Sequence, residues 1–290
     1  MKSGFVNIIG NPNVGKSTLL NALVGEKLSI ITPKAQTTRH RMNAVVSGED
    51  FQAVFTDTPG IVDTHSRLHQ TMMASIGTAL QDADVFMLVV EVGETLKQPD
   101  IIEKVKGSGK PVILVLNKID LSDQETVRQR IAYWQGLLPQ ADIVPTSALN
   151  KFGTDFLLDT IKQRLPEHAP YYPNDTLTDR NMRFFVSEIV RKHILMRYQK
   201  EIPYACEVEV ERYEEGEKKD LISVVIYVER ESQKAIVIGH QGAAIKRLGM
   251  ASRREIENFT GKHCFLEMHV KVLKDWRNDA NALRQFGYED

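Results

Sequence analysis

The sequence predicts two domains of different class: an α/β domain with a mostly parallel six-stranded sheet, and a smaller α+β module after it. Up to about residue 165, short apolar runs rich in β-branched residues alternate with helical patterns, as in a parallel sheet with helices on both faces. Pro166, Pro170 and Pro173 then break this pattern, and the alternation does not return. We therefore place the first domain at residues 1–166, a linker at 167–180 and the second domain at 181–290.

The composition is that of a globular protein and excludes several other classes. The 290 residues are 42% hydrophobic, and 37 basic against 38 acidic residues give a net charge of −1, which argues against a basic tail. No apolar run is long enough to span a bilayer, and we expect no signal peptide. Cys206 and Cys264 lie in apolar alternating runs without metal-ligand spacing, so we expect reduced core residues of a cytoplasmic protein.

The first domain is expected to contain six strands and five helices. Only Gly48–Asp50 separates the second strand from the third, so we expect these two to form a hairpin with the second strand at a sheet edge. The predicted strands are 5–10, 42–47, 51–57, 85–92, 111–117 and 142–147. The predicted helices are 16–25, 67–83, 100–109, 125–138 and 156–165.

The second domain has a different order of elements. A helix precedes two long alternating strands, two further helices follow, and a strand and a last helix close the chain. The helices are predicted at 182–198, 232–238, 243–259 and 275–286, and the strands at 205–213, 221–229 and 264–273. Antiparallel strands backed by helices are typical of an α+β module.

Residues 10–17, GNPNVGKS, fit the pattern G-x-x-x-x-G-K-[ST] between a predicted strand and a predicted helix, which is the context of a P-loop. Gly10 and Gly15 let backbone N–H groups approach phosphate oxygens, and the helix start adds its dipole. Lys16 would reach the β- and γ-phosphates, and the Ser17 hydroxyl would bind Mg²⁺. The predicted nucleotide contacts here are Asn11, Asn13, Val14, Gly15, Lys16, Ser17 and Thr18.

The sequence NKID, residues 117–120, ends a predicted strand and indicates guanine recognition. The Asp120 carboxylate can accept hydrogen bonds from both N1–H and the exocyclic amine of guanine, a donor pair that adenine lacks. Asn117 and the Lys118 stem would complete the base pocket, and Ser147-Ala148 would add a backbone N–H. GTP and GDP are therefore the predicted ligands.

DTPG, residues 57–60, ends the third predicted strand and is typical of a γ-phosphate sensor. Asp57 would hold Mg²⁺ through water, and the Gly60 N–H would reach the γ-phosphate. The polar segment KAQTTRHR precedes it, and we choose Thr38 as the hydroxyl that joins Mg²⁺ only with GTP, with Thr37 as the alternative. Lys16, Thr38 and Gly60 are the predicted catalytic residues.

Ile61 follows the DTPG glycine at the position where Ras-like GTPases carry a water-positioning Gln. Because Ile cannot orient water, we expect slow intrinsic hydrolysis. Asn13 has two interpretations: its amide oxygen could bind K⁺ where an arginine finger would otherwise neutralise charge, or it is a turn residue that tolerates left-handed geometry.

The second domain carries a GxxG loop between two predicted helices, in an order typical of a type II KH domain. Such a loop lets a phosphodiester backbone pass close to main-chain N–H groups and clamps about four nucleotides. The stretch from Ile236 to Arg277 contains eight basic and four acidic residues, a local net charge of +4. The predicted RNA-binding residues are Gly239, His240, Gln241, Gly242, Lys246 and Arg247.

The motifs GNPNVGKSTLLNALVG, KAQTTRHR, DTPG, NKID, SAL, VIGHQG and VKVLKDWRND are together similar to those of the Era family, bacterial GTPases with a C-terminal KH domain. The resemblance covers essentially the whole chain. It implies a TRAFAC-class GTPase that binds the 3′ end of 16S rRNA through the KH domain and assists maturation of the 30S ribosomal subunit. It also implies a cytoplasmic protein with a fraction peripheral at the inner membrane. Ile61 agrees with the family, which lacks the catalytic Gln.

Three alternatives come from other functional classes. A tRNA-modifying GTPase would need further machinery such as a C-terminal cysteine motif, and no cysteine follows Cys264. A pure RNA-binding scaffold would not need every GTP motif intact. A membrane-associated cell-cycle regulator would need a stronger basic amphipathic helix. We expect a monomer, because neither domain shows an obvious unpaired apolar face.

Overall fold

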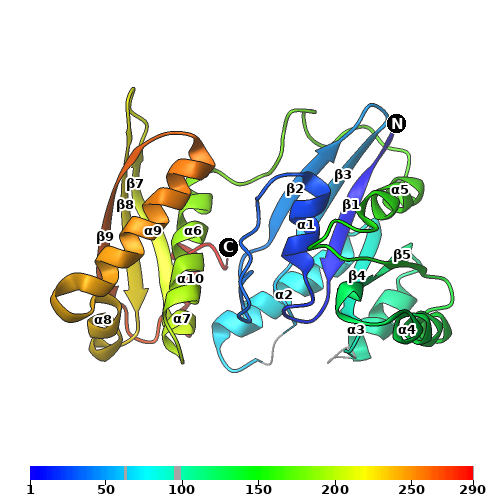
Figure 1. Ribbon diagram of the computed structural model, residues 1–290, viewed down its shortest axis with the longest axis horizontal. Coiled ribbons are helices and arrows are strands. Elements are labelled where there is room, and N and C mark those ends of the chain that lie inside the picture. The colour runs from blue at the N-terminus through cyan, green and yellow to red at the C-terminus, as the bar shows by residue number, and fades with distance from the viewer. Residues whose placement is uncertain (62–63, 95–98, 290) are drawn as a thin grey trace. The chain divides into compact units, whose positions relative to one another are not determined.

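The computed structural model describes residues 1–61, 64–94 and 99–289. The chain divides into two compact units (Figure 1). The first unit comprises Met1–Thr64 and Met72–Asp179, and the second comprises His65–Thr71 and Arg180–Asp290. Each unit has its own sheet, and each is described by itself below.

The first unit is built on a six-stranded sheet with the order β2-β3-β1-β4-β5-β6. All neighbouring strands are parallel except β2 and β3, which are antiparallel, with β2 at one edge. The predicted sheet and its single hairpin are therefore confirmed. The strands are β1 (Lys2–Ile9), β2 (Met42–Ser47), β3 (Phe51–Asp57), β4 (Val85–Glu91), β5 (Val112–Asn117) and β6 (Asp142–Pro145).

Helices cover both faces of this sheet (Figure 1). On one face α1 packs against α5 and against β2 and β3. On the other, Phe86 and Leu88 of β4 share a buried apolar cluster with Ile76, Ile101 and Trp134 from three helices. The helices are α1 (Lys16–Val24), α2 (Arg67–Asp82), α3 (Pro99–Gly107), the short η1 (Ile119–Leu121), α4 (Gln124–Leu137) and α5 (Thr154–Arg164); of α2, the part from Met72 onward belongs to this unit.

The carboxyl ends of the parallel strands bring the sequence motifs to one edge of the sheet. Ile8 of β1 pairs with Asp57 of β3, and Glu91 of β4 pairs with Asn117 of β5. The P-loop, DTPG and NKID segments each begin where one of these strands ends. In open α/β sheets this edge is where ligands bind.

The segment before the second unit lies along the edge strand β2. The Val45 N–H donates to the Leu177 carbonyl oxygen at 2.9 Å, and the Asn43 N–H donates to Asp179 Oδ1 at 3.0 Å. These bonds satisfy part of the edge that β2 would otherwise present.

Gln52 of β3 fixes the same segment closer to the prolines. Its side chain is fully buried, and its Oε1 accepts the N–H groups of Tyr171 and Tyr172 at 2.8 and 3.0 Å. Its Nε2 donates to the Tyr172 carbonyl at 2.8 Å and to Ser47 Oγ at 3.1 Å. One buried amide thus satisfies several backbone groups of the chain between the units.

The second unit has a three-stranded sheet with the order β7-β8-β9, in which β7 and β8 are antiparallel and β8 and β9 parallel. Its apolar core joins this sheet to α6, α8 and α9, which confirms the predicted α+β module. The elements are α6 (Met182–Arg197), α7 (Ile202–Ala205), β7 (Glu207–Glu214), β8 (Asp220–Val228), α8 (Glu231–Ile238), η2 (His240–Gly242), α9 (Ala243–Thr260), β9 (Cys264–Val272) and α10 (Ala280–Gln285).

Two details of the second unit differ from the predictions. The last helix does not begin at 275 but at Ala280, because Asp275 has a left-handed φ of 52° and the Asp279 side chain caps the helix by accepting from the Ala282 N–H. The short helix α7 was not predicted. Cys206 and Cys264 are free and buried as expected, and within the described ranges no helix combines the length and apolarity that a bilayer span needs.

Candidate functional site

The P-loop leaves β1 through two positions where only glycine fits. Gly15 has a φ of 97°, and a Cβ there would lie 2.3 Å from the Asn117 side chain. A Cβ on Gly10 would lie 2.3 Å from the Val89 carbonyl oxygen. Any side chain at either position would push the loop away from the sheet, so the two glycines hold the backbone at the N-terminus of α1.

Lys16 lies inside this loop and is only 6% exposed. Its ammonium donates to the carbonyl oxygens of Gly10 at 3.0 Å and Asn11 at 2.9 Å. Burial lowers the pKa of Lys16 to about 8, while the charges of Asp57 and Glu94 act in the opposite direction. A buried ammonium held by neutral carbonyls gains strongly from a phosphate anion at the same place.

Ser17, Thr38 and Asp57 come together from three separate segments. The Ser17 and Thr38 hydroxyl oxygens are 3.0 Å apart, and these hydroxyls lie 3.0 and 3.4 Å from Asp57 Oδ2. Asp57 is 0% exposed, and burial raises the pKa of its carboxyl against the effect of Lys16 and the hydroxyls. In the described part of the chain nothing donates to the buried Oδ1 of Asp57. Oxygen ligands of this kind fit Mg²⁺.

The two candidate threonines before β2, Thr37 and Thr38, have different hydrogen-bond partners. The Thr37 hydroxyl donates to the Lys34 carbonyl at 2.7 Å and lies 2.7 Å from Thr32 Oγ1, so it stabilises a local turn. Thr38 lies at Ser17 and Asp57 instead.

Asn13 has a left-handed φ of 65°, and its amide nitrogen donates to the Pro33 carbonyl at 3.2 Å. Its amide oxygen takes no part in that bond.

The DTPG segment packs directly on the P-loop. A Cβ on Gly60 would lie 2.9 Å from Pro12 Cα, and Thr58 Oγ1 donates to the Ile8 carbonyl at 2.7 Å. The Ile61 side chain is 3% exposed and belongs to the apolar cluster beneath α2, α3 and α4. It faces the core rather than the phosphate side.

Asn117 connects the NKID segment and the segment after β6 to the P-loop. Its Nδ2 donates to the Val14 carbonyl at 2.8 Å, and its Oδ1 accepts the Ala148 N–H at 3.0 Å and the Thr146 hydroxyl at 3.2 Å. The Ser147 hydroxyl accepts the Asn150 N–H at 3.4 Å. Asn117 is thus a structural link among three loops.

Lys118 and Asp120 flank this link. Lys118 has a left-handed φ of 63°, and its ammonium lies 2.7 Å from the Glu91 carboxylate at the end of β4. Asp120 is exposed within η1. Motif reasoning missed Glu91. It also missed Ser29, whose hydroxyl donates to Asp57 Oδ2 at 3.1 Å. Neither residue belongs to a named motif, and only the pairing of β4 with β5 points to Glu91.

The GxxG loop of the second unit exposes its backbone. Gly239 has a φ of 74°, and a Cβ there would lie 2.6 Å from Ala244 Cβ. Gly242 has a φ of 76° and faces open space. His240 and Gln241 between them are exposed, and Gln241 also has a positive φ of 48°.

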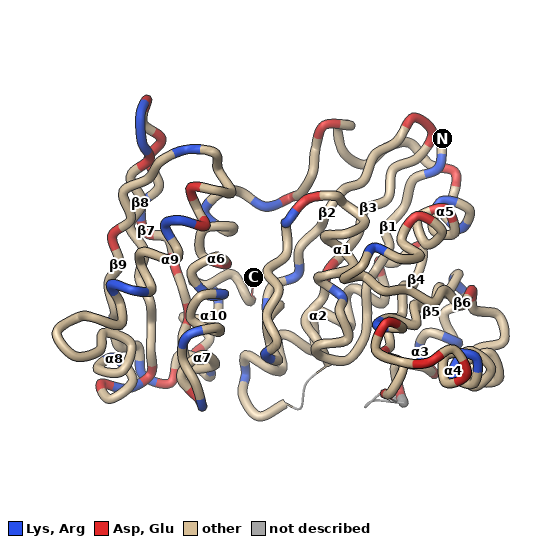
Figure 2. The backbone as a smooth tube through the Cα atoms, viewed as in Figure 1, with Lys and Arg blue, Asp and Glu red and all other residues tan. Residues whose placement is uncertain are grey.

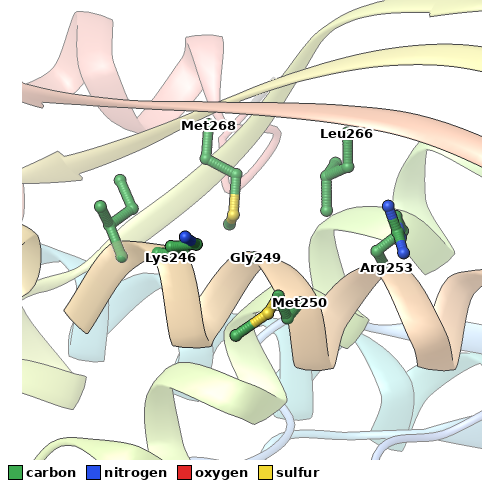
Figure 3. A pocket seen from close by; sticks show the side chains of 7 residues that line it. Lys246, Gly249, Met250, Arg253, Leu266 and Met268 are labelled. Atoms are coloured by element: carbon green, nitrogen blue, oxygen red, sulfur yellow. The ribbon is translucent and has the colours of Figure 1, made fainter. Parts of the chain in front are cut away.

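A groove of about 300 Å³ lies between α9 and β9 (Figure 3). Met250 and Met268 give it apolar walls, and Lys246 and Arg253 stand along it (Figure 3). A Cβ on Gly249 would lie 3.3 Å from Met268 Sδ, so glycine keeps the helix close to the strand here. The lining residues are Ile245, Lys246, Gly249, Met250, Arg253, Leu266 and Met268.

Ion pairs with acidic residues from outside residues 236–277 neutralise most of the predicted excess of positive charge in that range. Lys262, Lys271 and Arg277 lie 2.6–2.7 Å from the carboxylates of Asp220, Glu211 and Glu229. Basic and acidic positions are interspersed along both units (Figure 2). Lys246 and Arg247, beside the groove, are exposed and form no ion pair with any residue that the structure describes. Their charge therefore remains available to an anionic ligand.

The fold and these sites define a P-loop GTPase domain followed by a KH domain. A model of the 50S ribosome-binding GTPase family matches residues 5–118, and a KH domain model matches residues 201–277. GTPase Era from Syntrophus aciditrophicus is 44% identical over 293 residues, covering 100% of this chain and 96% of the relative. GTPase Era from Staphylococcus epidermidis is 44% identical over 290 residues, covering 99% and 97%. The chain belongs to the Era family of GTPases.

Two solved structures resemble the whole chain. A variant of Aquifex aeolicus Era bound to GDP and AlF4⁻ superimposes with a TM-score of 0.95 at 38% identity, covering 100% of both chains. Era in complex with MgGDPNP and nucleotides 1506–1542 of 16S ribosomal RNA superimposes with a TM-score of 0.94 at 38% identity, again covering 100% of both.

Proposed function

We propose that the chain is a GTP-controlled switch that binds the 3′ end of 16S rRNA through its KH domain and assists 30S subunit maturation. The observation that carries this proposal is a complete GTP motif set in the same chain as a GxxG loop beside a groove with free basic residues. The relative bound to MgGDPNP and 16S rRNA nucleotides supports both halves of it.

We infer that Mg²⁺ is the cofactor, held at the cluster of Ser17, Thr38 and Asp57. The two hydroxyls supply oxygens for direct ligation, and the unpartnered Oδ1 of Asp57 is suited to accept from a metal-bound water. When bound, Mg²⁺ neutralises phosphate charge. The contact of Thr38 with both other residues makes the segment before β2 responsive to the γ-phosphate.

We propose that Lys16 and the Gly60 N–H stabilise charge on the transferred phosphoryl group. Lys16 acts from a desolvated position, where its charge is little screened. Ile61 packs in the core and offers no group to the attacking water, which supports slow intrinsic hydrolysis. At the base, Asp120 supplies guanine recognition, and Asn117 with Lys118 and Ala148 shapes the pocket around it.

Potassium should accelerate hydrolysis if the Asn13 amide oxygen ligates it beside the phosphates. We expect turnover about tenfold faster in K⁺ than in Na⁺ at equal ionic strength, which corresponds to ~1.4 kcal/mol of transition-state charge stabilisation. The Asn13→Ala variant should lose the difference between the two buffers. Phosphate-release assays in matched salts measure it, and equal rates for the wild type in both salts would refute the potassium site.

At the RNA, we propose that the backbone of Gly239 to Gly242 carries the phosphodiester chain, while Lys246 and Arg247 supply positive charge. His240 and Gln241 are exposed between the glycines and lie within reach of the same chain. The groove beside α9 then receives bases against Met250 and Met268.

Crosslinking to ribosomal RNA tests the whole proposal. The protein should crosslink to the 3′ end of 16S rRNA in its Mg-GDPNP form and much less in its GDP form. A Lys246→Glu, Arg247→Glu double variant should lose the crosslinks but retain GTP binding, because these residues lie in the other unit. Crosslinks that are scattered along the RNA, or that do not depend on the nucleotide, would refute the proposed function.

We further propose a monomer in the cytoplasm with a fraction peripheral at the inner membrane. The family resemblance supports this location. Fractionation of cells and sedimentation of the purified protein measure the two properties.

A further inference from the structure

One hydroxyl beside Asp57 belongs to neither of the two proposed metal ligands, Ser17 and Thr38. Ser29 lies in the loop between α1 and β2, and its hydroxyl donates to Asp57 Oδ2 at 3.1 Å. That distance is close to the 3.0 Å of Ser17 and shorter than the 3.4 Å of Thr38 on the same oxygen. Three hydroxyls, one from α1 and two from the loop between α1 and β2, therefore converge on one buried carboxylate oxygen.

Ser29 differs from Thr38 in how its backbone is held. The Asn21 side chain in α1 donates to the Ser29 carbonyl at 2.7 Å and accepts the Ser29 N–H at 2.9 Å. Leu28 and Ile30 on either side are buried. Ser29 is thus attached to the helix that begins at the P-loop, so its position is tied to the phosphate-binding element.

We propose that Ser29 is a positioning residue for the magnesium site. Its hydrogen bond fixes the rotation of the Asp57 carboxylate, so that Oδ1, to which no described residue donates a hydrogen bond, stays available to a metal-bound water. Ser17 and Thr38 are the proposed metal ligands, whereas the Ser29 hydroxyl has no such role and donates to Asp57 Oδ2.

Nucleotide release measured across a Mg²⁺ titration tests this inference, which rests on the magnesium site proposed above. For Ser29→Ala, the Mg²⁺ concentration that half-maximally slows release of fluorescent GDP should rise about tenfold, as expected for loss of one hydrogen bond to a charged group. Release in EDTA should match the wild type, because no metal is then present. Ser29→Thr, which keeps a hydroxyl, should restore the wild-type Mg²⁺ response.

Ser3→Ala is a matched control. Ser3 in β1 is also a serine of the first unit, fully buried, and its hydroxyl has no partner among the described residues, so its removal should leave the Mg²⁺ curve unchanged. If the Ser29→Ala curve overlaps that of the wild type, or if GDP release is accelerated equally in EDTA and in Mg²⁺, the proposed role of Ser29 is wrong. Either result would leave the proposed magnesium site standing. A wild type whose release ignores Mg²⁺ would overturn the magnesium site itself and this inference with it.

Discussion

Lys16→Ala should weaken GTP binding by about 10²- to 10⁴-fold, the loss expected for two or more hydrogen bonds from a charged donor to phosphate. The ammonium is buried and bonded to the loop carbonyls of Gly10 and Asn11, so its removal takes a desolvated positive charge away from the phosphates and leaves two carbonyl oxygens without this donor. Equilibrium titration with a fluorescent GTP analogue measures the affinity.

The second unit should remain folded in this variant, because Lys16 lies wholly within the first. Trp276 in the second unit is fully buried and reports on its packing by fluorescence, together with circular dichroism. Lys110→Ala is the matched control, since Lys110 is a partly exposed residue of the first unit whose ammonium donates to the Gln81 carbonyl at 2.8 Å. Normal GTP affinity in Lys16→Ala, or equal loss in Lys110→Ala, would contradict the assigned role.

Gly249→Leu should reduce affinity for a 16S rRNA 3′-end oligonucleotide by about tenfold to a hundredfold, because the new side chain fills the groove that we propose receives the bases; each tenfold corresponds to ~1.4 kcal/mol of lost contact. A Cβ at this position would lie 3.3 Å from Met268 Sδ, so the flexible Met268 side chain must shift; the roughly 0.5–1 kcal/mol by which glycine is unfavourable in a helix interior offsets this contact. RNA binding should therefore fall without a loss of stability, as measured by titration and thermal unfolding.

Asn258→Leu provides the matched control for the groove. It places the same side chain on the same helix, nine residues further along and so on the opposite face. This variant should bind RNA as the wild type does. If Gly249→Leu also binds normally, or unfolds at a much lower temperature than Asn258→Leu, the groove does not hold the RNA in the proposed way.

The sequence predicts the motif-bearing loops well because their chemistry leaves few choices. Gly15 must be glycine to adopt its left-handed φ next to Asn117, and the strands that end at Asp57 and Asn117 are rich in apolar residues and almost wholly buried. Parallel pairing then brings these ends to one edge. The order of elements around Gly239 and Gly242 predicts the KH domain for the same reason.

Contacts between residues outside the motifs could not be predicted. Ser29 reaches Asp57 only because Asn21 holds its backbone, and nothing in the local pattern shows this. Met268 and Leu266 read as core residues of a strand but line a groove, since Gly249 opposes them.

Local charge counts misled for a related reason. Lys271 and Glu211 are 60 residues apart in sequence, yet β7, β8 and β9 bring them to 2.6 Å. A count along the chain does not include a partner that comes from another strand.

The hydrogen bonds of Gln52 decide where the chain can be cut. A recombinant fragment that ends before Tyr171 would lose the N–H and carbonyl groups of Tyr171 and Tyr172 and leave the buried Gln52 amide unsatisfied. Its free energy of unfolding should fall by about 1–3 kcal/mol for each lost partner. It would also uncover β2 and invite pairing with other chains. The shortest soluble GTPase fragment should therefore end at Asp179, whose carboxylate still holds Asn43.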